Sequence, residues 1–124
     1  MKVGTFDIII PLLEFLQDKE FHNLSETCLH LQKSMRLSIK EKNEYYQSRN
    51  KNSNIIKLHS TKFYIRVADA VHIIRKSGLI DDFDNQKGKG KFRLNENGFD
   101  FLKNDNAQMI KQTKLIFEKW KSDK

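Results

Sequence analysis

The residues of this 124-residue chain whose types and spacing suggest chemistry are basic, and they lie close together in the sequence. Lys87, Lys89 and Lys91 alternate with two glycines, and Arg93 continues the alternation. In a strand, this spacing places the four cationic side chains on one side. The glycines let the backbone bend and approach another backbone closely. Such a segment is suited to contacting phosphate groups, although a solvated hairpin tip would have the same composition.

A helix is predicted immediately before this basic segment. Ser60 is a suitable N-cap because its hydroxyl can accept a hydrogen bond from a free N–H of the first turn. Gly78 is placed to end the helix in a left-handed conformation. Apolar residues recur between them at intervals of three and four, and they are Phe63, Val67, Ala70, Val71 and Ile74. The pattern predicts a helix with one buried face.

Burial of that face points other side chains of the first turns outward, among them Thr61, Lys62 and Ile65. The N-terminal turns of a recognition helix are the part that reaches base edges in the major groove. The predicted contacts of this helix are Ser60, Thr61, Lys62, Tyr64, Ile65 and Arg66. Tyr64 is expected between the core and a phosphate. Arg66 has two interpretations, a DNA contact or an ion pair with an acid on a neighbouring helix.

The net charge of +7 is concentrated around these two segments. Residues 57–93 contain nine Lys or Arg and four Asp, whereas the segments on either side carry a net charge of +1 each. Basic charge of this size favours polyanions through counterion release, without specifying a sequence. A generally basic, solvated surface is the alternative.

Three further helices are predicted before residue 48. The first runs from Phe6 to Leu16, with Pro11 either in its first turn or at a kink. The second begins at the cap Ser25 and ends near residue 33. The third begins at Ser38, which with Glu41 has the spacing of a capping box, and ends near residue 47.

Two short apolar segments flank the glycine-rich tip and predict a hairpin, after which Asn95 can cap another helix. Helix, hairpin and return strand form the second half of a winged helix-turn-helix. We therefore predict a mainly α fold with a small β-wing and an extra C-terminal helix. Residues 1–104 are the predicted winged-helix DNA-binding domain. Residues 105–124 are predicted as an amphipathic helix that packs on this domain, lies at a dimer seam, or links to a domain absent here.

Catalytic and metal-binding patterns are absent from the sequence. Cys28 and His30 are two residues apart, so on a helix they face away from each other. The Gly-Lys segment lacks the ending of a phosphate-binding P-loop. We expect no enzyme activity, no metal and no cofactor. The single cysteine and the lack of a signal peptide or membrane span predict a cytoplasmic protein.

Short motifs along the chain resemble one known family. They are Pro11-Leu12-Leu13, His22 with Glu26, Leu37-Ser38-x-x-Glu41, Arg66-Val67-x-x-Ala70, Gly78-Leu79-Ile80 and Phe92-Arg93-Leu94-Asn95-Glu96-Asn97-Gly98. In this order they resemble the N-terminal winged-helix domain of Mrr-type restriction proteins, over about residues 6 to 103. The resemblance implies the DNA-recognition half of a modification-dependent nuclease, whose catalytic domain is separate. Asp69 stands where that family usually has Trp, and Ser77 and Asn95 also depart from its pattern.

Nucleases of that kind hold a metal with an acidic residue and a Glu-x-Lys or Asp-x-Lys pair. None of the sixteen Asp and Glu residues of this chain is followed by Lys two positions later. The expected function is therefore recognition of double-stranded DNA within a restriction system, without nuclease residues in this chain. The partner would be a separate catalytic domain or a second copy. The alternatives are a small winged-helix transcriptional regulator and a winged-helix protein–protein interaction module.

Overall fold

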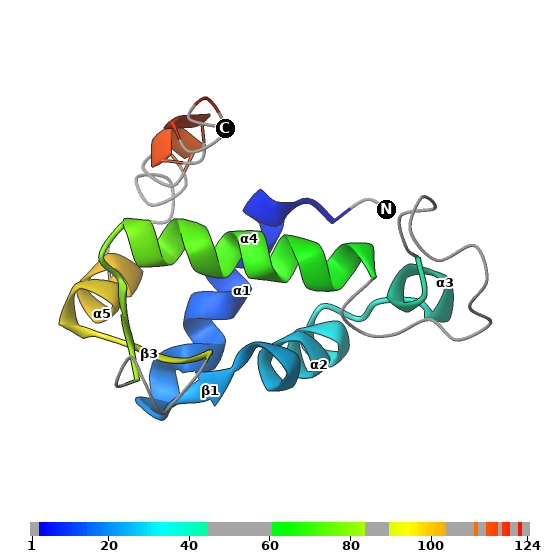
Figure 1. The fold of residues 1–124 in the computed structure, drawn as a ribbon, viewed down its shortest axis with the longest axis horizontal. Helices are drawn as coiled ribbons and strands as arrows, with labels where there is room; N and C mark the ends of the chain where they lie inside the picture. Colours follow the sequence, from blue (N-terminus) through cyan, green and yellow to red (C-terminus); the bar gives the residue numbers. More distant parts are fainter. Residues whose placement is uncertain are drawn as a thin grey trace.

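The chain folds into an α-rich, winged-helix-like domain with a small three-stranded antiparallel sheet (Figure 1). The structure is a computed structural model, and it describes residues 3–44, 61–83, 90–103, 111, 114–116, 118–119 and 122. The elements in chain order are α1 (Thr5–Phe15), the short 3-10 helix η1 (Leu16–Asp18), β1 (His22–Asn23), α2 (Leu24–Ser34), α3 (Ile39–Lys42), α4 (Lys62–Lys76), β2 (Ile80–Asp82), β3 (Lys91–Leu94) and α5 (Glu96–Lys103). The predicted fold class is confirmed.

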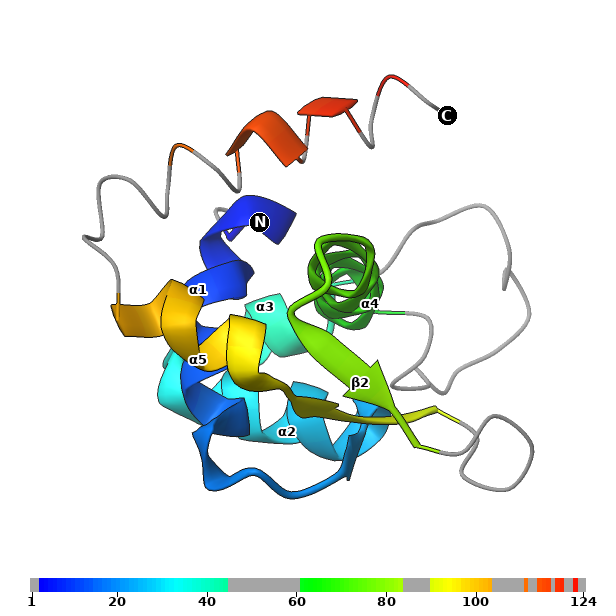
Figure 2. The ribbon, with the colours of Figure 1, turned by 90° about the vertical axis from the view of Figure 1, so that its left-hand side faces the viewer.

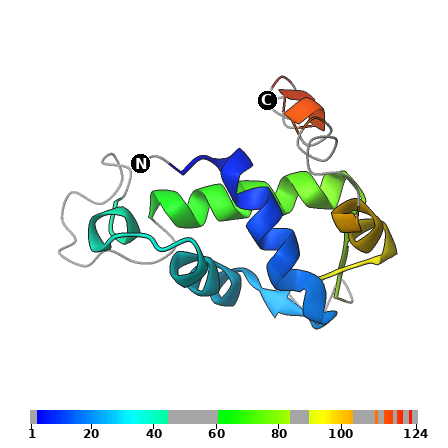
Figure 3. The same cartoon turned by 180° about the vertical axis from the view of Figure 1, so that it is seen from behind.

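Helix α4 runs along the domain, and α1 crosses it on the far side of Figure 1, as Figure 3 shows from behind. All five apolar residues predicted for its inner face are buried. From α1, the largest buried contributions to the same core are Ile8, Ile9, Leu12 and Leu13. The hydrophobic core therefore holds α4 by one face and leaves the opposite face to the surface.

Both ends of α4 are defined by local hydrogen bonds. The N-cap is Thr61 rather than the predicted Ser60, which lies outside the described residues. The Thr61 hydroxyl accepts a hydrogen bond of 3.3 Å from the N–H of Tyr64. At the other end, the N–H of Leu79 donates to the carbonyl of Ile74 at 3.0 Å, and Gly78 has a φ of +76°. This is a Schellman ending, as the glycine predicted.

The earlier helices differ from their predicted bounds. Pro11 lies in the second turn of α1 rather than the first, where it has no N–H to donate to the carbonyl of Asp7. Helix α2 is capped by Asn23 rather than Ser25, because the Asn23 side chain accepts a 2.8 Å hydrogen bond from the N–H of Glu26. The predicted N-terminus of α3 is confirmed.

At that N-terminus, Ser38 and Glu41 exchange two hydrogen bonds of 3.1 Å, which complete the capping box. The helix ends at Lys42, before the predicted end near residue 47, with Asn43 as its C-cap. Residues 45–60 lie outside the described residues. In the part of the chain that the structure describes, no helix is both long enough and apolar enough to cross a membrane.

The sheet has the order β1-β3-β2, and the hairpin of β2 and β3 is confirmed (Figure 2). Phe92 pairs with His22 on one side and with Asp82 on the other, and its own side chain is buried. Arg93 pairs with Asp81 in the antiparallel register, so these two exposed side chains share the outer face of the sheet. The tip, residues 84–89, lies outside the described residues.

Helix α5 closes the domain against the hairpin. Asn95 caps it as predicted, accepting a 3.0 Å hydrogen bond from the N–H of Gly98. A Cβ atom at Gly98 would lie 2.3 Å from a side-chain carbon of Leu94 and 2.5 Å from the carbonyl oxygen of Leu79. Of the described residues after α5, Ile116 packs against the core. The role of residues 105–124 stays a prediction.

Candidate nucleic-acid interface

The first turn of α4 contains residues that were predicted to read bases, but two of them have partners within the domain. The predicted outward orientation of Thr61 is wrong, because its side chain is only 2% exposed and caps the helix. Lys62 forms a 3.1 Å ion pair with Glu44, and its backbone N–H donates to the carbonyl of Glu44 at 2.8 Å. The hydrogen bond from Lys62 lowers the pKa of the Glu44 carboxyl. A phosphate at Lys62 would therefore compete with a carboxylate.

The next residues of α4 divide between the core and the surface. Tyr64 is partly buried and packs against the core, in line with its predicted position. Ile65 is partly exposed. Arg66 donates a 2.7 Å hydrogen bond to the backbone carbonyl of Val3, so its structural role is to hold the N-terminal segment. The acid that was considered as a partner of Arg66 is replaced by a main-chain oxygen.

The hairpin presents its basic residues differently. Lys91 and Arg93 are both exposed on β3, whereas Lys87 and Lys89 lie outside the described residues. The Arg93 guanidinium lies 4.7 Å from the centroid of the Phe21 ring. Because this ring is on the outer face of the sheet, Arg93 points away from the core against which α4 packs. The predicted alternation along the strand thus holds for the described pair, Lys91 and Arg93.

The start of α4 and the strand β3 lie at opposite ends of the helix, as Figure 1 shows. A 15-residue helix spans about 22 Å at the usual rise per residue. The predicted contacts therefore form two clusters rather than one patch. One cluster is at the N-terminus of α4, and the other is on the hairpin that follows its C-terminus.

Arg75 connects the C-terminal end of α4 to the hairpin, and the sequence reasoning missed it. Its Nε donates to both carboxylate oxygens of Asp82 at 3.0 Å, and its Nη2 lies 2.9 Å from one of them. This two-pronged contact links the last turn of α4 to strand β2. The helix dipole favours the two cations in the last turn, Arg75 and Lys76. In the sequence, the only indication of the ion pair was that acidic residues follow these cations within seven positions.

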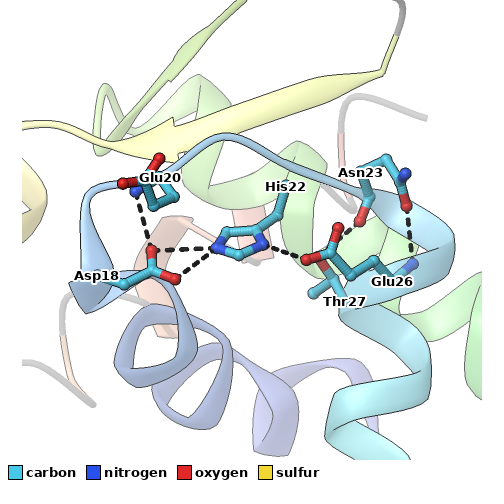
Figure 4. A network of polar contacts seen from close by, with 6 residues as sticks. All are labelled: Asp18, Glu20, His22, Asn23, Glu26 and Thr27. Carbon is cyan, nitrogen blue, oxygen red and sulfur yellow. Dashed lines mark hydrogen bonds and ion pairs between the residues drawn. The ribbon is translucent and has the colours of Figure 1, made fainter.

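A network of hydrogen bonds around His22 connects strand β1 to the elements on either side of it in the chain (Figure 4). His22 is 8% exposed, and its two ring nitrogens face two carboxylates. Nδ1 lies 2.5 Å from Glu26 and Nε2 lies 2.8 Å from Asp18. Burial by itself would lower the pKa of His22, but the hydrogen bonds that the ring donates to both carboxylates outweigh it and raise the pKa. An imidazolium, with an N–H on each nitrogen, satisfies both acceptors at once.

This network joins three elements, because Asp18 ends η1, His22 begins β1 and Glu26 belongs to the first turn of α2. Burial by itself would raise the pKa of Asp18. The hydrogen bond from the N–H of Glu20 and the neighbouring His22 ring outweigh burial and lower this pKa. The imidazole also packs 4.5 Å from the ring of Phe15. Both ring nitrogens of His22 are occupied by carboxylates on opposite sides of the ring. This arrangement suits a residue that holds the three elements together, and it leaves no nitrogen to bind a metal.

Cys28 is a buried thiol on α2. Burial raises its pKa to about 12, so at neutral pH it is protonated and weakly nucleophilic. His30, two residues later, stacks on Phe15 with ring centroids 4.3 Å apart. Within the described ranges, no group of three His, Cys, Asp or Glu side chains is arranged to hold a metal ion.

Comparison with protein families identifies this arrangement. The model of the Mrr N-terminal domain matches residues 7–104, which include nearly all of α1 and continue past the end of α5. The chain belongs to the Mrr N-terminal domain family. The resemblance inferred from short motifs is confirmed, with bounds that differ by one residue at each end. Comparison with curated proteins and with solved structures gave no match.

In this Mrr N-terminal domain, most of the motif residues that indicated the family have structural tasks. Ser38 and Glu41 form a capping box, and His22 pairs with Glu26. Gly78 ends α4, and Gly98 allows α5 to approach the hairpin. The motifs therefore specify the fold, and the residues that would contact DNA have to be argued from charge and exposure.

Proposed function

We propose that this Mrr N-terminal domain binds double-stranded DNA as the recognition module of a restriction system. The observation that carries the proposal is the pairing of α4 with a basic hairpin through Arg75 and Asp82, in a domain with an α-rich, winged-helix-like fold. The chain contributes recognition and no nuclease chemistry, because none of its acids is followed by Lys two positions later. It acts where DNA is found, in the cytoplasm, with a separate catalytic domain or a second copy as partner.

The two clusters would have different tasks on DNA. Lys87, Lys89 and Lys91 on the hairpin would contact phosphates, which gives affinity without sequence preference. Lys62 and Ile65 at the start of α4 would enter the major groove, where Ile65 can contact a thymine methyl group. Of the other predicted contacts, Thr61 and Arg66 support the domain from within, as their hydrogen bonds indicate.

A gel-shift series with one duplex, prepared with and without methylated bases, tests the proposal at low and at higher salt. We expect binding that weakens steeply with salt, because phosphate contacts release counterions. Lys62→Ala should change the preference among duplexes of different sequence or modification. A uniform loss for all duplexes would instead assign Lys62 to a phosphate. Absence of binding at low salt would overturn the proposal.

A protein–protein interaction module is the second candidate, and exposed apolar side chains favour it. Ile39 on α3 is 78% exposed and Leu29 on α2 is 51% exposed. Large apolar groups of this kind are enriched at interaction sites when they cluster. A domain that forms a stable complex with a protein and fails to bind DNA at low salt would support this function. A transcriptional regulator would share the DNA contacts and differ in its sites, which lie at promoters.

A further inference from the structure

A pocket lies on the outer face of the sheet, away from the start of α4. It has a volume of about 510 Å³, and it is bounded by the turn after η1, the hairpin and the start of α5. This volume is within the range of small-molecule sites in proteins. The residues that line it and carry the argument are Lys19, Arg93, Asp81, Glu96, Asn95 and Phe99.

Two cations are held in position at this pocket by aromatic rings. The Lys19 ammonium lies 5.0 Å from the centroid of Phe99, and the Arg93 guanidinium lies 4.7 Å from that of Phe21. Lys19 is the C-cap of η1 and has a φ of +65°. In the described part of the chain, neither cation forms an ion pair. Both are therefore available to an anionic group.

The pocket also contains two carboxylates, Asp81 and Glu96. Asp81 accepts a 3.3 Å hydrogen bond from the side-chain amide of Asn95, and that amide also donates to the carbonyl of Gly78 at 2.9 Å. Glu96 is exposed in the first turn of α5. One wall of the pocket is thus fixed by hydrogen bonds, and it presents acceptors close to the two cations.

This mixture of charges restricts the ligand. Lys19 and Arg93 would attract a bare phosphate, but the carboxylates would repel it. A simple cation would be attracted by the carboxylates and repelled by Lys19 and Arg93. A ligand that carries a phosphate and a neutral N–H donor satisfies both sets of groups. Carboxylates accept hydrogen bonds from the exocyclic amine of cytosine, and the part of the Phe99 ring that is not buried can contact a base.

We propose that this pocket binds a single nucleotide whose base carries an exocyclic amine. Lys19 and Arg93 hold the phosphate, and Asp81 or Glu96 accepts from the amine. The nucleotide comes either free from solution or as an unpaired residue of a nucleic-acid strand. The site shares no residue with the start of α4, but it shares Arg93 with the predicted DNA contacts of the hairpin, so single nucleotides rather than duplex DNA test it.

Amide NMR spectra of the whole 124-residue chain test the site during titration with CMP, with UMP and with inorganic phosphate. UMP is the matched control because it has a carbonyl where CMP has the amine. We expect CMP to shift the signals of Lys19, Arg93, Glu96 and Phe99, with an affinity about tenfold above that of UMP, since a hydrogen bond to a charged group is lost. Equal affinities for CMP and UMP, or shifts elsewhere only, would overturn the proposal.

Variants connect the binding to the two cations. Lys19→Ala and Arg93→Met should each weaken CMP binding, whereas Lys103→Ala, at the exposed far end of α5, should leave it unchanged. The same spectra report whether each variant is folded. If Lys19→Ala is not folded, Lys19→Gly replaces it, because glycine accepts the positive φ at this position. A short cytidine oligonucleotide separates the two sources. Tighter binding than CMP assigns the site to a strand, and weaker binding assigns it to the free nucleotide. Unchanged CMP affinity in folded Lys19 and Arg93 variants contradicts the site.

Discussion

The N-terminal turn of α4 and the hairpin strand β3 both carry predicted DNA contacts, but they differ in what those side chains already do. Thr61 caps its helix, Lys62 pairs with Glu44, and Arg66 holds the carbonyl of Val3. On β3, Lys91 is exposed, and Arg93 rests on an aromatic ring. Basic residues near each other in sequence are therefore not equally available to a ligand, because some of them stabilise the domain.

The largest effect is expected on the hairpin. Changing Lys87, Lys89 and Lys91 together to Ala should weaken duplex binding by at least about tenfold at moderate salt, for all sequences alike. The slope of log affinity against log salt should fall by about three, one for each phosphate contact. Fluorescence anisotropy at several salt concentrations measures both. An unchanged affinity at low salt, with the circular dichroism spectrum intact, would remove the hairpin from the interface.

The position of the hairpin depends on close packing at its base. Gly98→Ala places a Cβ atom 2.5 Å from a backbone oxygen of Leu79, which cannot move as a side chain can. We expect the free energy of unfolding to fall by about 1–3 kcal/mol, the usual effect of overpacking. Urea denaturation measures it, with Asp100→Ala, at an exposed position of the same helix, as the control. Stability equal to that of the parent would show that α5 is not tightly held.

The network around His22 predicts a pH dependence of stability. The folded-state pKa of His22 is raised above its ordinary value of 6.5, so its contribution is complete below that pH and is lost as the pH rises through the raised value. The pKa of Asp18 is lowered from 3.8, so its contribution is present above that pH and is lost on acidification. Stability should therefore be greatest between these values, as far as this network determines it.

His22→Gln tests this network. The substitution removes the imidazolium and should cost about 1–3 kcal/mol near pH 5.5, where the network is charged, and less at alkaline pH. Urea midpoints at both pH values measure the difference. His30→Gln is the control, because His30 is exposed and stacks on the same Phe15 ring. An equal loss at both pH values would mean that packing, and not charge, explains the role of His22.

The smallest effect is expected at the start of α4. Glu44→Gln removes the carboxylate that competes for Lys62 and should raise duplex affinity by a small factor, about two to three, as for exposed ion pairs in general. Glu14→Gln, an exposed position on α1, changes the net charge equally and is the matched control. An affinity gain in both variants would be an effect of overall charge. A gain in neither would show that Lys62 takes no part in binding.

Much of the fold follows from local patterns. The buried face of α4, its ending at Gly78 and the capping box at Ser38 depend on residues within one or two turns, and the structure confirms them. The cap of α4 lies one residue later than predicted, at Thr61, whose hydroxyl can cap a helix although serine is the more favoured type. Pro11 lies further inside α1 than expected for a residue without an N–H to donate. The helix continues through it, and Ile8 and Leu12 on either side of it are buried in the core.

The site was less predictable, because its decisive contacts join residues that are distant in sequence. Lys62 and Glu44 are 18 residues apart, and Arg66 and Val3 are 63 apart. No periodicity or spacing rule indicates such pairs. The stacking of Arg93 on Phe21 likewise depends on the pairing of β1 with β3, which is set by the whole fold. Charge and helical pattern predicted where basic residues lie, but not which of them have internal partners.

The most direct test is the affinity of the unaltered chain for a DNA duplex, measured by anisotropy as a function of salt concentration. We expect binding at low salt that weakens steeply and linearly in a log–log plot, with the slope of several phosphate contacts. Undetectable binding at low salt, or binding that salt does not change, would contradict it.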